Sequence, residues 1–457
     1  MSTVDFDVII VGGGSAGYAC ALRSSQLGQK VAVVERAELG GTCLHSGCVP
    51  TKALLHSAEV ADAVAHAEQV GVRASFEGIE MSRVHAHKYK VVARLHKGLE
   101  GLIRAGGITV IDGDGRLVDR HTVAVADDRY CADSVVLATG SVARTMGLEI
   151  GRRVLTSTEA LALAQVPARA VIVGGSVIGV EFASLWRSFG SEVTIVEEMP
   201  GLAPLEDPFL QKELARAFRR RKILARTGTR VQRVVETEHA VTVDLDDGDV
   251  VEADVALIAV GRGPNSADLK LSDAGVTTDR GWVVTDERLR TNLESVYAIG
   301  DLVQGLQLAH RGFAHGIFVA EEIAGLRPEP IIDSAIPRVT YCNPELASVG
   351  LTEQQAIDRF GSGTVRTAEY MLAGNGRSQI LGTSGGVKVV RAENGSVVGV
   401  HMIGARMGEQ VGEASVLVNH GLVPEDAARF IHAHPTQNEA LGEALLVLSG
   451  TPLHAHS

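Results

Sequence analysis

Two cysteines that could exchange electrons stand five residues apart in the segment 40–52, which reads GGTCLHSGCVPTK. In a regular α-helix the Cα atoms of Cys43 and Cys48 would lie roughly 8–9 Å apart, whereas a disulfide needs a separation below about 7 Å. If the two bond, the helix between them must break, and Gly47 is where the backbone most easily deviates. So small a ring suits a bridge that opens and closes. Two unpaired thiols near a helix start are the alternative, and Pro50 favours such a start.

A first glycine motif lies where a dinucleotide phosphate would bind. Gly12, Gly14 and Gly17 follow an apolar strand predicted over residues 6–11, and a predicted helix comes directly after them. Gly12 would make the tight turn, Gly14 would let the backbone approach a pyrophosphate, and Gly17 would permit close packing of helix on strand. The helix N-terminus would then face the phosphates. Glu35 ends the next strand, where its carboxylate can accept a hydrogen bond from a ribose hydroxyl.

The same unit returns later in the chain, with Gly174, Ser176 and Gly179 in the turn and Glu197 at the end of the following strand. The first turn glycine and the acid are 23 positions apart in both units. The repeat indicates two dinucleotide sites, and two nucleotides beside a dithiol imply an electron relay. The first site is next to the cysteines in sequence and is expected to hold a flavin, and the second a nicotinamide.

Glu197 predicts which nicotinamide binds. A carboxylate at this position accepts from the 2′-hydroxyl of NAD and repels the 2′-phosphate of NADP. The next residue is Glu198, and no arginine that could bind a 2′-phosphate replaces Glu197. Ser176 stands where the fingerprint has its second glycine, so its Cβ could crowd the pyrophosphate. We therefore expect NAD to bind, but with less room for its pyrophosphate beside residue 176 than a glycine would leave.

The segment GGTCLHSGCVPTKALL resembles the redox-active segment of the flavoprotein disulfide reductases, and most closely that of the dihydrolipoamide dehydrogenases. The usual pattern is near GGTCLNxGCxPSKALL, from which His45 and Thr51 depart. The resemblance implies that Cys43 exchanges with the substrate and that Cys48 faces the flavin. A thiol at a helix N-terminus has its pKa lowered toward thiolate, which fits the second role.

Two charged residues join this segment through the resemblance. Lys52 lies four residues past Cys48, and a cation there would stabilise a thiolate and a reduced flavin; a solvated surface lysine is the alternative. Glu181, just after the second glycine motif, resembles the acid that pairs with this lysine. Without the family, Glu181 would be an ordinary helix carboxylate.

The string IHAHPTQNEA at residues 431–440 is similar to the family signature HxHPTxxE. The resemblance makes His434 the acid–base for thiol exchange and Glu439 its orienting acid, because histidine titrates near working pH. The two cannot meet on one regular helical face, but Pro435 predicts a turn at the start of a helix. His432 is expected to make structural contacts.

Other family segments surround the expected flavin. Residues 138–141, ATGS, would close over FAD, Asp301 would hold the ribitol, and the helix opened by residues 306–310 would aim its positive end at the flavin. His315, where relatives often carry Glu, receives no role. The candidate FAD contacts are Gly12, Gly14, Gly17, Glu35, Gly41, Thr42, Lys52, Gly115, Thr139, Gly140, Ser141, Asp301, Leu308 and Ala309. The candidate NAD contacts are Gly174, Ser176, Gly179, Glu197 and Gly261.

These motifs predict an α/β protein with two Rossmann-like dinucleotide-binding domains, for FAD and NAD, and a C-terminal α+β dimerisation domain. The expected divisions are 1–146 (FAD domain, first part), 147–265 (NAD domain), 266–335 (FAD domain, second part) and 336–457 (dimer interface domain). Further helices are predicted at 18–27, 90–105, 408–419 and 424–430, and further strands at 170–173, 192–196, 255–260, 387–390 and 397–403.

Composition narrows the class of protein. The 457 residues suggest about three domains, and a formal net charge of −12 argues against nucleic acid or an anionic membrane as an obligate partner. Five cysteines are too few for a secreted disulfide scaffold, so Cys20, Cys131 and Cys342 are expected to be buried and inert. The first strand begins without a basic leader and no apolar run reaches membrane-spanning length, so a cytoplasmic protein is expected.

The resemblance implies NAD-dependent oxidation of dihydrolipoyl groups by a homodimer. The expected partner is a lipoylated acyltransferase or H-protein-type carrier of a 2-oxoacid dehydrogenase or glycine cleavage complex. The alternatives are an NAD(P)H-dependent reductase of another low-molecular-weight disulfide and a non-catalytic FAD-binding subunit. Mercuric reductases and large thioredoxin reductases need a further C-terminal cysteine or selenocysteine pair, and no cysteine follows Cys342. Glutathione-type reductases prefer NADP and would want basic residues near Glu197.

Overall fold

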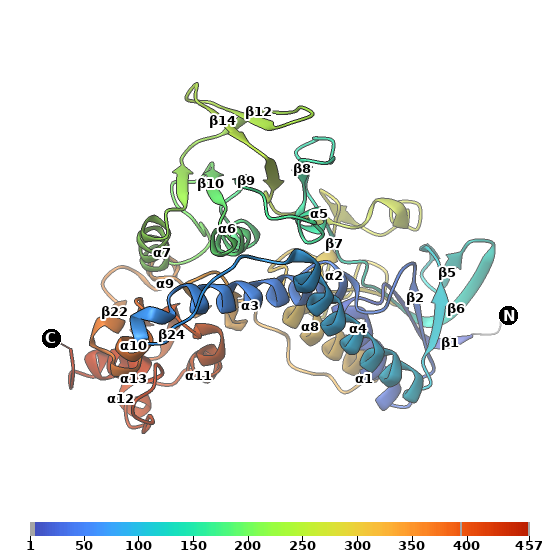
Figure 1. Ribbon diagram of the computed structural model, residues 1–457. Helices are drawn as coiled ribbons and strands as arrows, with labels where there is room; N and C mark the ends of the chain where they lie inside the picture. The colour runs from blue at the N-terminus through green and yellow to red at the C-terminus, as the bar shows by residue number, and fades with distance from the viewer. Residues whose placement is uncertain (1–4, 394, 456–457) are drawn as a thin grey trace.

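The computed structural model describes residues 5–393 and 395–455. Its three largest sheets are two built around parallel strands and one that is antiparallel (Figure 1). The strands of the first sheet are β1 (Phe6–Val11), β2 (Val31–Glu35), β3 (Thr109–Asp112), β4 (Gly115–Asp119), β5 (Thr122–Val125), β6 (Asp128–Leu137) and β19 (Val296–Ala298). Their order is β3-β2-β1-β6-β5-β4, with β19 pairing in parallel on β6.

The central strand β1 lies between β2 and β6, with Val8 opposite Val31 on one side and Ser134 on the other. Helices cover this sheet, so its central strands are apolar without alternation, and Ile9 and Ile10 are fully buried. Helices α1 (Ser15–Gln26) and α8 (Ala309–Ile323) pack closely against each other.

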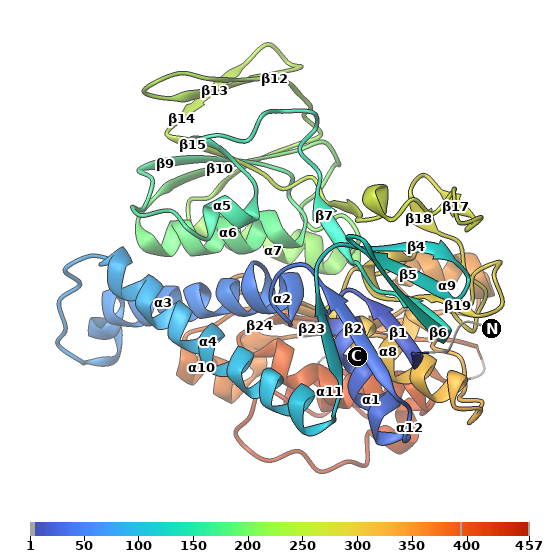
Figure 2. The same ribbon diagram turned by 90° about the vertical axis from the view of Figure 1, so that its right-hand side faces the viewer.

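The second sheet is wholly parallel, in the order β11-β10-β9-β15-β8, and an antiparallel sheet β12-β13-β14 lies above it in Figure 2. Its strands are β8 (Val154–Leu155), β9 (Arg169–Val173), β10 (Glu192–Glu197), β11 (Leu224–Thr227) and β15 (Val255–Ile258); those above are β12 (Val231–Glu236), β13 (Val241–Leu245) and β14 (Val250–Ala253). The helices of this region are α5 (Ser157–Ala160), α6 (Val177–Phe189) and α7 (Pro208–Arg220).

The chain crosses between the two parallel sheets twice, and the two crossings pair with each other. Strand β7 (Ser141–Ala143) runs antiparallel to β16 (Arg262–Pro264). The outgoing and returning segments therefore form one short ribbon between the two nucleotide motifs. A small hairpin of β17 (Thr278–Asp279) and β18 (Trp282–Val283) follows the second crossing.

The third sheet is antiparallel, in the order β20-β21-β24-β23-β22, and helices α11 and α13 pack on it. Its strands are β20 (Arg338–Thr340), β21 (Glu345–Gly350), β22 (Arg366–Met371), β23 (Gly386–Arg391) and β24 (Val397–Gly404). The helices are α9 (Glu353–Phe360), α10 (Gly376–Leu381), α11 (Met407–Asn419), α12 (Pro424–Ala427) and α13 (Glu439–Leu448). The core between this sheet and its helices includes Val400, Leu417 and Leu441.

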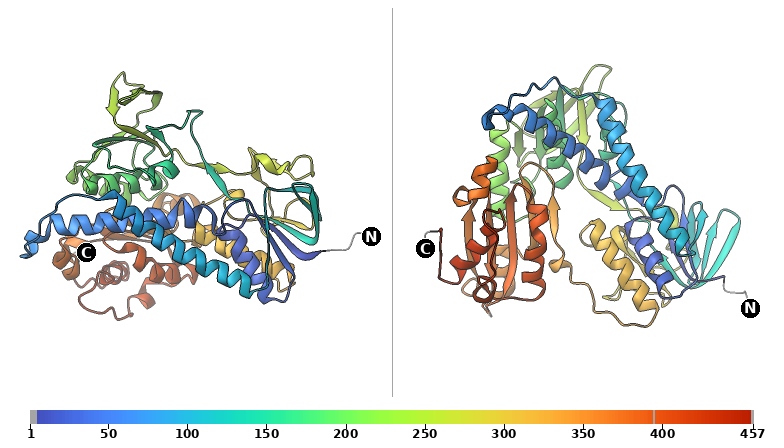
Figure 3. Two further views of the ribbon diagram at one scale, coloured as in Figure 1. Left: turned by 45° about the vertical axis from the view of Figure 1, so that its right-hand side comes forward. Right: turned by 60° about the horizontal axis from the view of Figure 1, so that its bottom comes forward.

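Two long helices link these parts. Figure 3 shows α3 (Cys48–Ala65) and α4 (Met81–Ala105) as a packed pair extending from the first sheet toward the third. Leu54 of α3 shares one buried cluster with Phe182 of α6 and Leu346 of β21. The helix that begins at Cys48 is thus held by both neighbouring domains. The short helices are α2 (Gly41–His45), η1 (Ala67–Val70), η2 (Ala267–Leu269), η3 (Gly300–Leu302), η4 (Asp333–Ala335) and η5 (Leu372–Gly374).

Most predicted elements are confirmed, and three details were wrong. The helix predicted at 90–105 begins nine residues earlier, at Met81, and the helix predicted at 424–430 ends at Ala427. Cys20 and Cys342 are buried as expected, but Cys131 is half-buried, in the outer part of β6 where the strand pairs with β5 and with the chain just before β1. Across the described residues, no helix combines the length and apolar character needed to cross a membrane. The domain divisions at 146, 265 and 335 stay a proposal.

Candidate functional site

The first glycine motif forms a tight turn between β1 and α1. Gly12 has φ +106°, and a Cβ on Gly17 would collide with the Gly12 carbonyl oxygen, so helix and strand need glycine at both positions. Glu35 accepts hydrogen bonds from the backbone N–H of Gly13 at 2.7 Å and of Ala37 at 3.0 Å. Because a carboxylate offers about four acceptor sites, these bonds orient Glu35 and leave it able to accept from ribose hydroxyls.

The second motif repeats this geometry in detail. Gly174 has φ +105°, a Cβ on Gly179 would collide with the Gly174 carbonyl oxygen, and Glu197 accepts from Gly175 N–H at 2.6 Å and Met199 N–H at 2.7 Å. The internal repeat predicted from spacing is therefore a repeat of backbone structure. Gly115 packs between Val11 and Val34 beside the first turn.

The N-termini of α1 and α6 fit a bound pyrophosphate. No side chain caps either helix; their N-cap residues are Gly14 and Ser176, both with extended backbone. The nearest atom to a Cβ built on Gly14 is Gly41 Cα, at 4.0 Å, so the space in front of the first helix is open to a ligand. Uncapped backbone N–H groups at a helix N-terminus suit phosphate oxygens. The residues present thus fit FAD at the first turn and NAD at the second.

The substitution Ser176→Gly tests how closely the second turn approaches its nucleotide. The Ser176 hydroxyl makes no capping hydrogen bond, so its replacement by glycine removes no contact within the chain. We expect Ser176→Gly to bind NAD equally well or more tightly, because the Cβ no longer crowds the pyrophosphate. The dissociation constant of NAD, measured by titration calorimetry, checks this. Markedly weaker binding would identify the serine hydroxyl as a contact.

The redox segment lies directly against the first glycine motif. Gly40 N–H donates to the Gly13 carbonyl at 2.8 Å, and a Cβ on Gly41 would meet Gly14 Cα at 2.8 Å. The Ser15 side chain, at the start of α1, hydrogen-bonds Cys43. The sulfur pair is therefore in contact range of the first nucleotide turn, which the electron relay requires.

The helix breaks between the two cysteines, as their spacing predicted. Helix α2 ends at His45 and α3 begins at Cys48, with Gly47 as N-cap. A Cβ on Gly47 would lie 2.9 Å from the Thr42 carbonyl oxygen, so this position favours glycine. Both cysteines are free thiols here, and their side chains are joined by a hydrogen bond, so the structure describes the dithiol state of the pair.

The two thiols have opposite acidities. The hydrogen bond from Cys43 lowers the pKa of Cys48 to about 7, against the effect of burial and with help from the positive charge of Lys52. The pKa of Cys43 is raised far above its usual range by the same hydrogen bond, by burial and by the negative charge of Cys48. Near neutral pH the reduced pair is therefore a Cys43 thiol donating to a Cys48 thiolate.

Lys52 is held beside this thiolate by three contacts. Its Nζ donates to Glu181 Oε1 at 2.9 Å and Oε2 at 2.8 Å, and lies 4.7 Å from the centre of the Tyr341 ring. Burial disfavours the charged lysine, but Glu181 outweighs this and raises the pKa of Lys52. Glu181 also accepts from Tyr341 N–H at 2.9 Å. The lysine–glutamate pair expected from the sequence is present, and it joins α3, α6 and the start of the third sheet.

Removing the charge of Lys52 should raise the pKa of Cys48 above about 7. In Lys52→Met the thiolate loses a neighbouring cation while Glu181 keeps its negative charge, so a higher pH is needed to ionise Cys48. Thiolates alkylate and thiols do not. The pH dependence of Cys48 alkylation by iodoacetamide in the reduced protein, located by mass spectrometry, should shift upward. Lys90→Met, an exposed lysine on α4, is the control; an unshifted profile in Lys52→Met would contradict the prediction.

A hydrogen-bonded chain crosses the ribbon between the nucleotide motifs. Ser141 Oγ donates to Asp301 at 2.8 Å and accepts from Arg262 Nε at 2.8 Å. Burial raises the pKa of Asp301 against the opposing effects of Ser141 and Arg262. Thr139 Oγ1 donates to the Asn265 carbonyl at 2.7 Å.

The structure also places five further candidate cofactor residues, two of them at this ribbon. Asn265 N–H donates to the Gly140 carbonyl at 2.9 Å, and Arg144 N–H donates to the Gly261 carbonyl at 3.0 Å. Helix α8 begins at Ala309 with Leu308 as an N-cap that makes no side-chain cap. Thr42, on α2, is exposed.

His434 and Glu439 meet across the turn that Pro435 predicted. His434 Nδ1 lies 2.8 Å from Glu439 Oε1, and Glu439 Oε2 accepts from Thr436 N–H at 2.7 Å. Burial opposes ionisation of Glu439, but the bonds from Thr436 and His434 hold its pKa below the usual range. His432 makes structural contacts, as expected: its Nε2 lies 3.0 Å from Glu413, and its ring packs where a Cβ on Gly442 would lie.

The structure does not bring His434 to the sulfur pair within one protomer. Its side chain is 76% exposed, and α13, which begins at Glu439, lies far from α2 in Figure 1. The His434–Glu439 pair and the cysteine pair therefore lie apart within one chain.

Three residues of the site escaped sequence reasoning. Arg262 bonds Ser141, Tyr341 faces Lys52, and Ser15 bonds Cys43. Ser15 could have been found, because it follows the first glycine motif directly. Arg262 and Tyr341 come from segments far along the chain, and neither belongs to a motif that indicates its partner.

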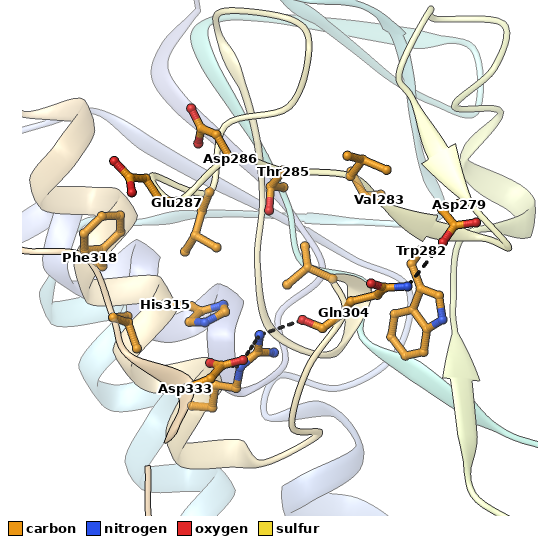
Figure 4. A pocket seen from close by; sticks show the side chains of 15 residues that line it. Asp279, Trp282, Val283, Thr285, Asp286, Glu287, Gln304, His315, Phe318 and Asp333 are labelled. Carbon is orange, nitrogen blue, oxygen red and sulfur yellow. Dashed lines mark hydrogen bonds and ion pairs between the residues drawn. The ribbon is translucent and has the colours of Figure 1, made fainter. Parts of the chain in front are cut away.

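A separate cavity of about 440 Å³ lies behind the Asp301 turn (Figure 4). Arg311 bonds Asp333 within it, and His315 accepts from Gly300 N–H at 3.3 Å. Burial and the charge of Arg311 lower the pKa of His315 to about 4, so the ring is neutral and supports the turn that carries Asp301. None of the candidate FAD or NAD residues lines this cavity.

Residues 6–316 match the family described as pyridine nucleotide-disulphide oxidoreductase, and residues 336–445 match its dimerisation domain. The chain is 37% identical over 472 residues to a dihydrolipoyl dehydrogenase of Bacillus subtilis, covering 98% of this chain and 99% of the relative. It is 38% identical over 456 residues to a dihydrolipoyl dehydrogenase of Chlorobaculum parvum, covering 97% of each. The crystal structure of LpdA from Mycobacterium tuberculosis superposes with a TM-score of 0.89 at 27% identity, covering 96% of this chain and 99% of that one.

Proposed function

The chain belongs to the pyridine nucleotide-disulphide oxidoreductase family, and from this membership we propose that it is an NAD-dependent dihydrolipoyl dehydrogenase that uses FAD. The observation that carries the proposal is the position of the sulfur pair. Cys43 and Cys48, on either side of a helix break, lie beside the first nucleotide turn, and Lys52 lies one turn beyond Cys48. Such a pair can accept electrons from a dithiol on one side and release them on the other.

The exchange steps follow from the chemistry of the two sulfurs. Starting from the disulfide, a substrate thiolate attacks Cys43 Sγ, the Cys43–Cys48 bond breaks, and Cys48 leaves as a thiolate. The second substrate sulfur then attacks the mixed disulfide, releasing Cys43 and a cyclic substrate disulfide. One substrate proton goes to His434 of the partner subunit and the other to Cys43, which yields the Cys43 thiol and Cys48 thiolate that the opposite pKa shifts of the pair favour. Bound FAD would supply the electron-pair acceptor for Cys48 and the hydride donor for NAD.

Particular residues of the chain support each step of this electron transfer. Glu181 and Tyr341 fix Lys52, whose charge stabilises the Cys48 thiolate and, by the same field, an electron-rich flavin. Glu35 and Glu197, both already oriented by turn N–H groups, accept from the ribose hydroxyls of FAD and NAD. Glu439 accepts from His434 Nδ1–H and leaves Nε2 free as the base.

The active form is a homodimer in this proposal, with a lipoylated partner. The matched dimerisation domain spans residues 336–445, and the exposed His434 needs a second chain to reach a sulfur pair. The electron donor is a lipoyl group on an acyltransferase of a 2-oxoacid dehydrogenase complex or on an H-protein-type carrier. A lipoyl group on a flexible arm could bring its dithiol to a Cys43–Cys48 disulfide that lies between two subunits.

One assay tests the proposed activity. The purified flavoprotein is mixed with dihydrolipoamide and NAD, and NADH formation is followed by absorbance; steady turnover is expected, with far lower turnover on NADP. If NADH does not form but NADH reduces another small disulfide, the protein is a different reductase of this family. Failure with every disulfide would leave a non-catalytic FAD-binding subunit.

A further inference from the structure

His45 stands between the two redox cysteines and is one of the two residues at which the redox segment departs from its family pattern. Its Nε2 lies 2.9 Å from the Leu39 carbonyl oxygen. A carbonyl oxygen only accepts, so Nε2 carries the hydrogen. In the neutral ring, Nδ1 then holds a lone pair, and this atom faces Glu38 Oε2 at 3.1 Å. Two electron-pair donors would then face each other, an arrangement that either a proton or a metal cation between them resolves.

A second histidine completes the cluster from another helix. His96 on α4 meets His45 edge to face, with ring centres 5.0 Å apart and planes at 82°. One ligand atom each from Glu38, His45 and His96 lies within 4.8 Å of the others. Glu100 Oε1, 3.9 Å from His96 Nε2, adds negative charge nearby. Within the part of the chain that the structure describes, this is the only such group of three.

The chemistry of these ligands indicates which ion fits. Two imidazoles and one carboxylate are a common zinc ligand set, and an open position is then filled by water. A metal-bound histidine usually donates its other N–H to a carbonyl or carboxylate, as His45 does to Leu39. Ligand atoms in a tetrahedral zinc site are about 3.4 Å apart. Glu38 and His45 already meet at 3.1 Å, so the ligand atom of His96 must approach this pair by up to about 1.4 Å to bind the same ion.

We propose that Glu38, His45 and His96 bind a divalent metal ion of the zinc class. The ion joins α2, which carries Cys43, to α4, and so clamps the redox segment from outside the flavin site. Glu38 and His45 belong to the same stretch of chain as Cys43, so a bound ion would hold the end of α2 against α4. The proposed ligands include neither redox cysteine, so the metal site is separate from the sulfur chemistry.

The test uses the holoenzyme with Cys43 and Cys48 oxidised to the disulfide, so that thiolates do not compete for the metal. Zinc chloride is titrated in a non-coordinating buffer by calorimetry. One ion per chain is expected, and His45→Asn and His96→Asn should each weaken its binding at least tenfold. His56→Asn is the matched control, because His56 pairs with Glu59 at 3.2 Å on α3 but belongs to no group of three. Equal binding in all variants would place the ion elsewhere and overturn the proposal.

A spectroscopic readout on the wild-type protein does not depend on whether a variant folds. Copper(II) added to the oxidised wild-type holoenzyme should give an electron paramagnetic resonance spectrum with couplings to two nitrogens, reduced to one in His96→Asn. Absence of zinc binding in the wild type, or a copper spectrum without nitrogen coupling, would mean that a proton and not a metal bridges His45 and Glu38. Either result refutes the site while leaving the proposed dehydrogenase activity untouched.

Discussion

Replacing Cys48 with serine should abolish electron flow from dihydrolipoamide to NAD while leaving FAD bound. The hydroxyl of serine ionises far too weakly to replace a thiolate whose pKa is about 7, and no disulfide can form with Cys43. Removal of one member of a covalent catalytic unit typically costs orders of magnitude, so we expect turnover to fall by at least about 10³-fold. NADH formation from dihydrolipoamide measures the loss.

Two controls separate this effect from damage to the fold. Cys48→Ser should still oxidise NADH with an artificial one-electron acceptor, because that path runs from nicotinamide to flavin without the sulfur pair. Cys131→Ser, a half-buried cysteine on β6 outside the site, should keep normal dihydrolipoamide turnover. Substantial dihydrolipoamide activity in Cys48→Ser would show that electrons bypass the sulfur pair.

The parts of the site that sequence predicted are those determined by local backbone chemistry. Gly12 and Gly174 adopt nearly the same φ, and Glu35 and Glu197 accept equivalent turn N–H groups, because each unit contains its whole hydrogen-bonding pattern within 23 positions. The break at Gly47 follows in the same way from the spacing of two cysteines. Local geometry of this kind can be read from spacing alone.

The parts that escaped prediction depend on contacts between distant segments. Tyr341 reaches Lys52 only because β20 and the following turn pack beneath α6, and Arg262 reaches Ser141 only because β16 pairs with β7. Neither residue has a neighbour pattern that encodes its partner. The early start of α4 at Met81 has a similar cause: Met81 and Val84 are half-buried, packed against the cluster that contains Leu54, so tertiary packing extends the helix.

The Lys52–Glu181 pair shows how these distant contacts serve the relay. Glu181 lies on α6, one turn beyond the second nucleotide turn, and Lys52 lies one turn beyond Cys48 on α3. The bidentate contact between them therefore fixes the two helices that begin at the thiolate and at the NAD motif. The same ion pair that affects the acidity of Cys48 also links α3 to α6, beside the apolar contacts of these two helices.

Mixing two inactive variants should restore activity if the base comes from the partner subunit. His434→Ala removes the proton acceptor, whose loss typically costs 10²–10⁴-fold in rate, and Cys43→Ser removes the sulfur that substrate attacks. Each variant alone should be nearly inactive. In a mixed dimer, one site combines the intact sulfur pair of one chain with the intact His434 of the other. Random exchange at equal concentration then gives about one quarter of the wild-type activity, since half of the dimers carry one working site.

The control mixes Glu439→Gln with His434→Ala. Both substitutions affect the same acid–base pair, in which His434 Nδ1 lies 2.8 Å from Glu439, so every mixed dimer carries a defective pair in both of its sites. No gain over the parents is expected, and flavin content and dimer mass are measured in parallel to confirm exchange. If Cys43→Ser and His434→Ala also fail to complement after subunits have exchanged, the base would have to act on the sulfur pair of its own chain. The 76% exposure of His434 and its distance from α2 would then require a large rearrangement within the protomer.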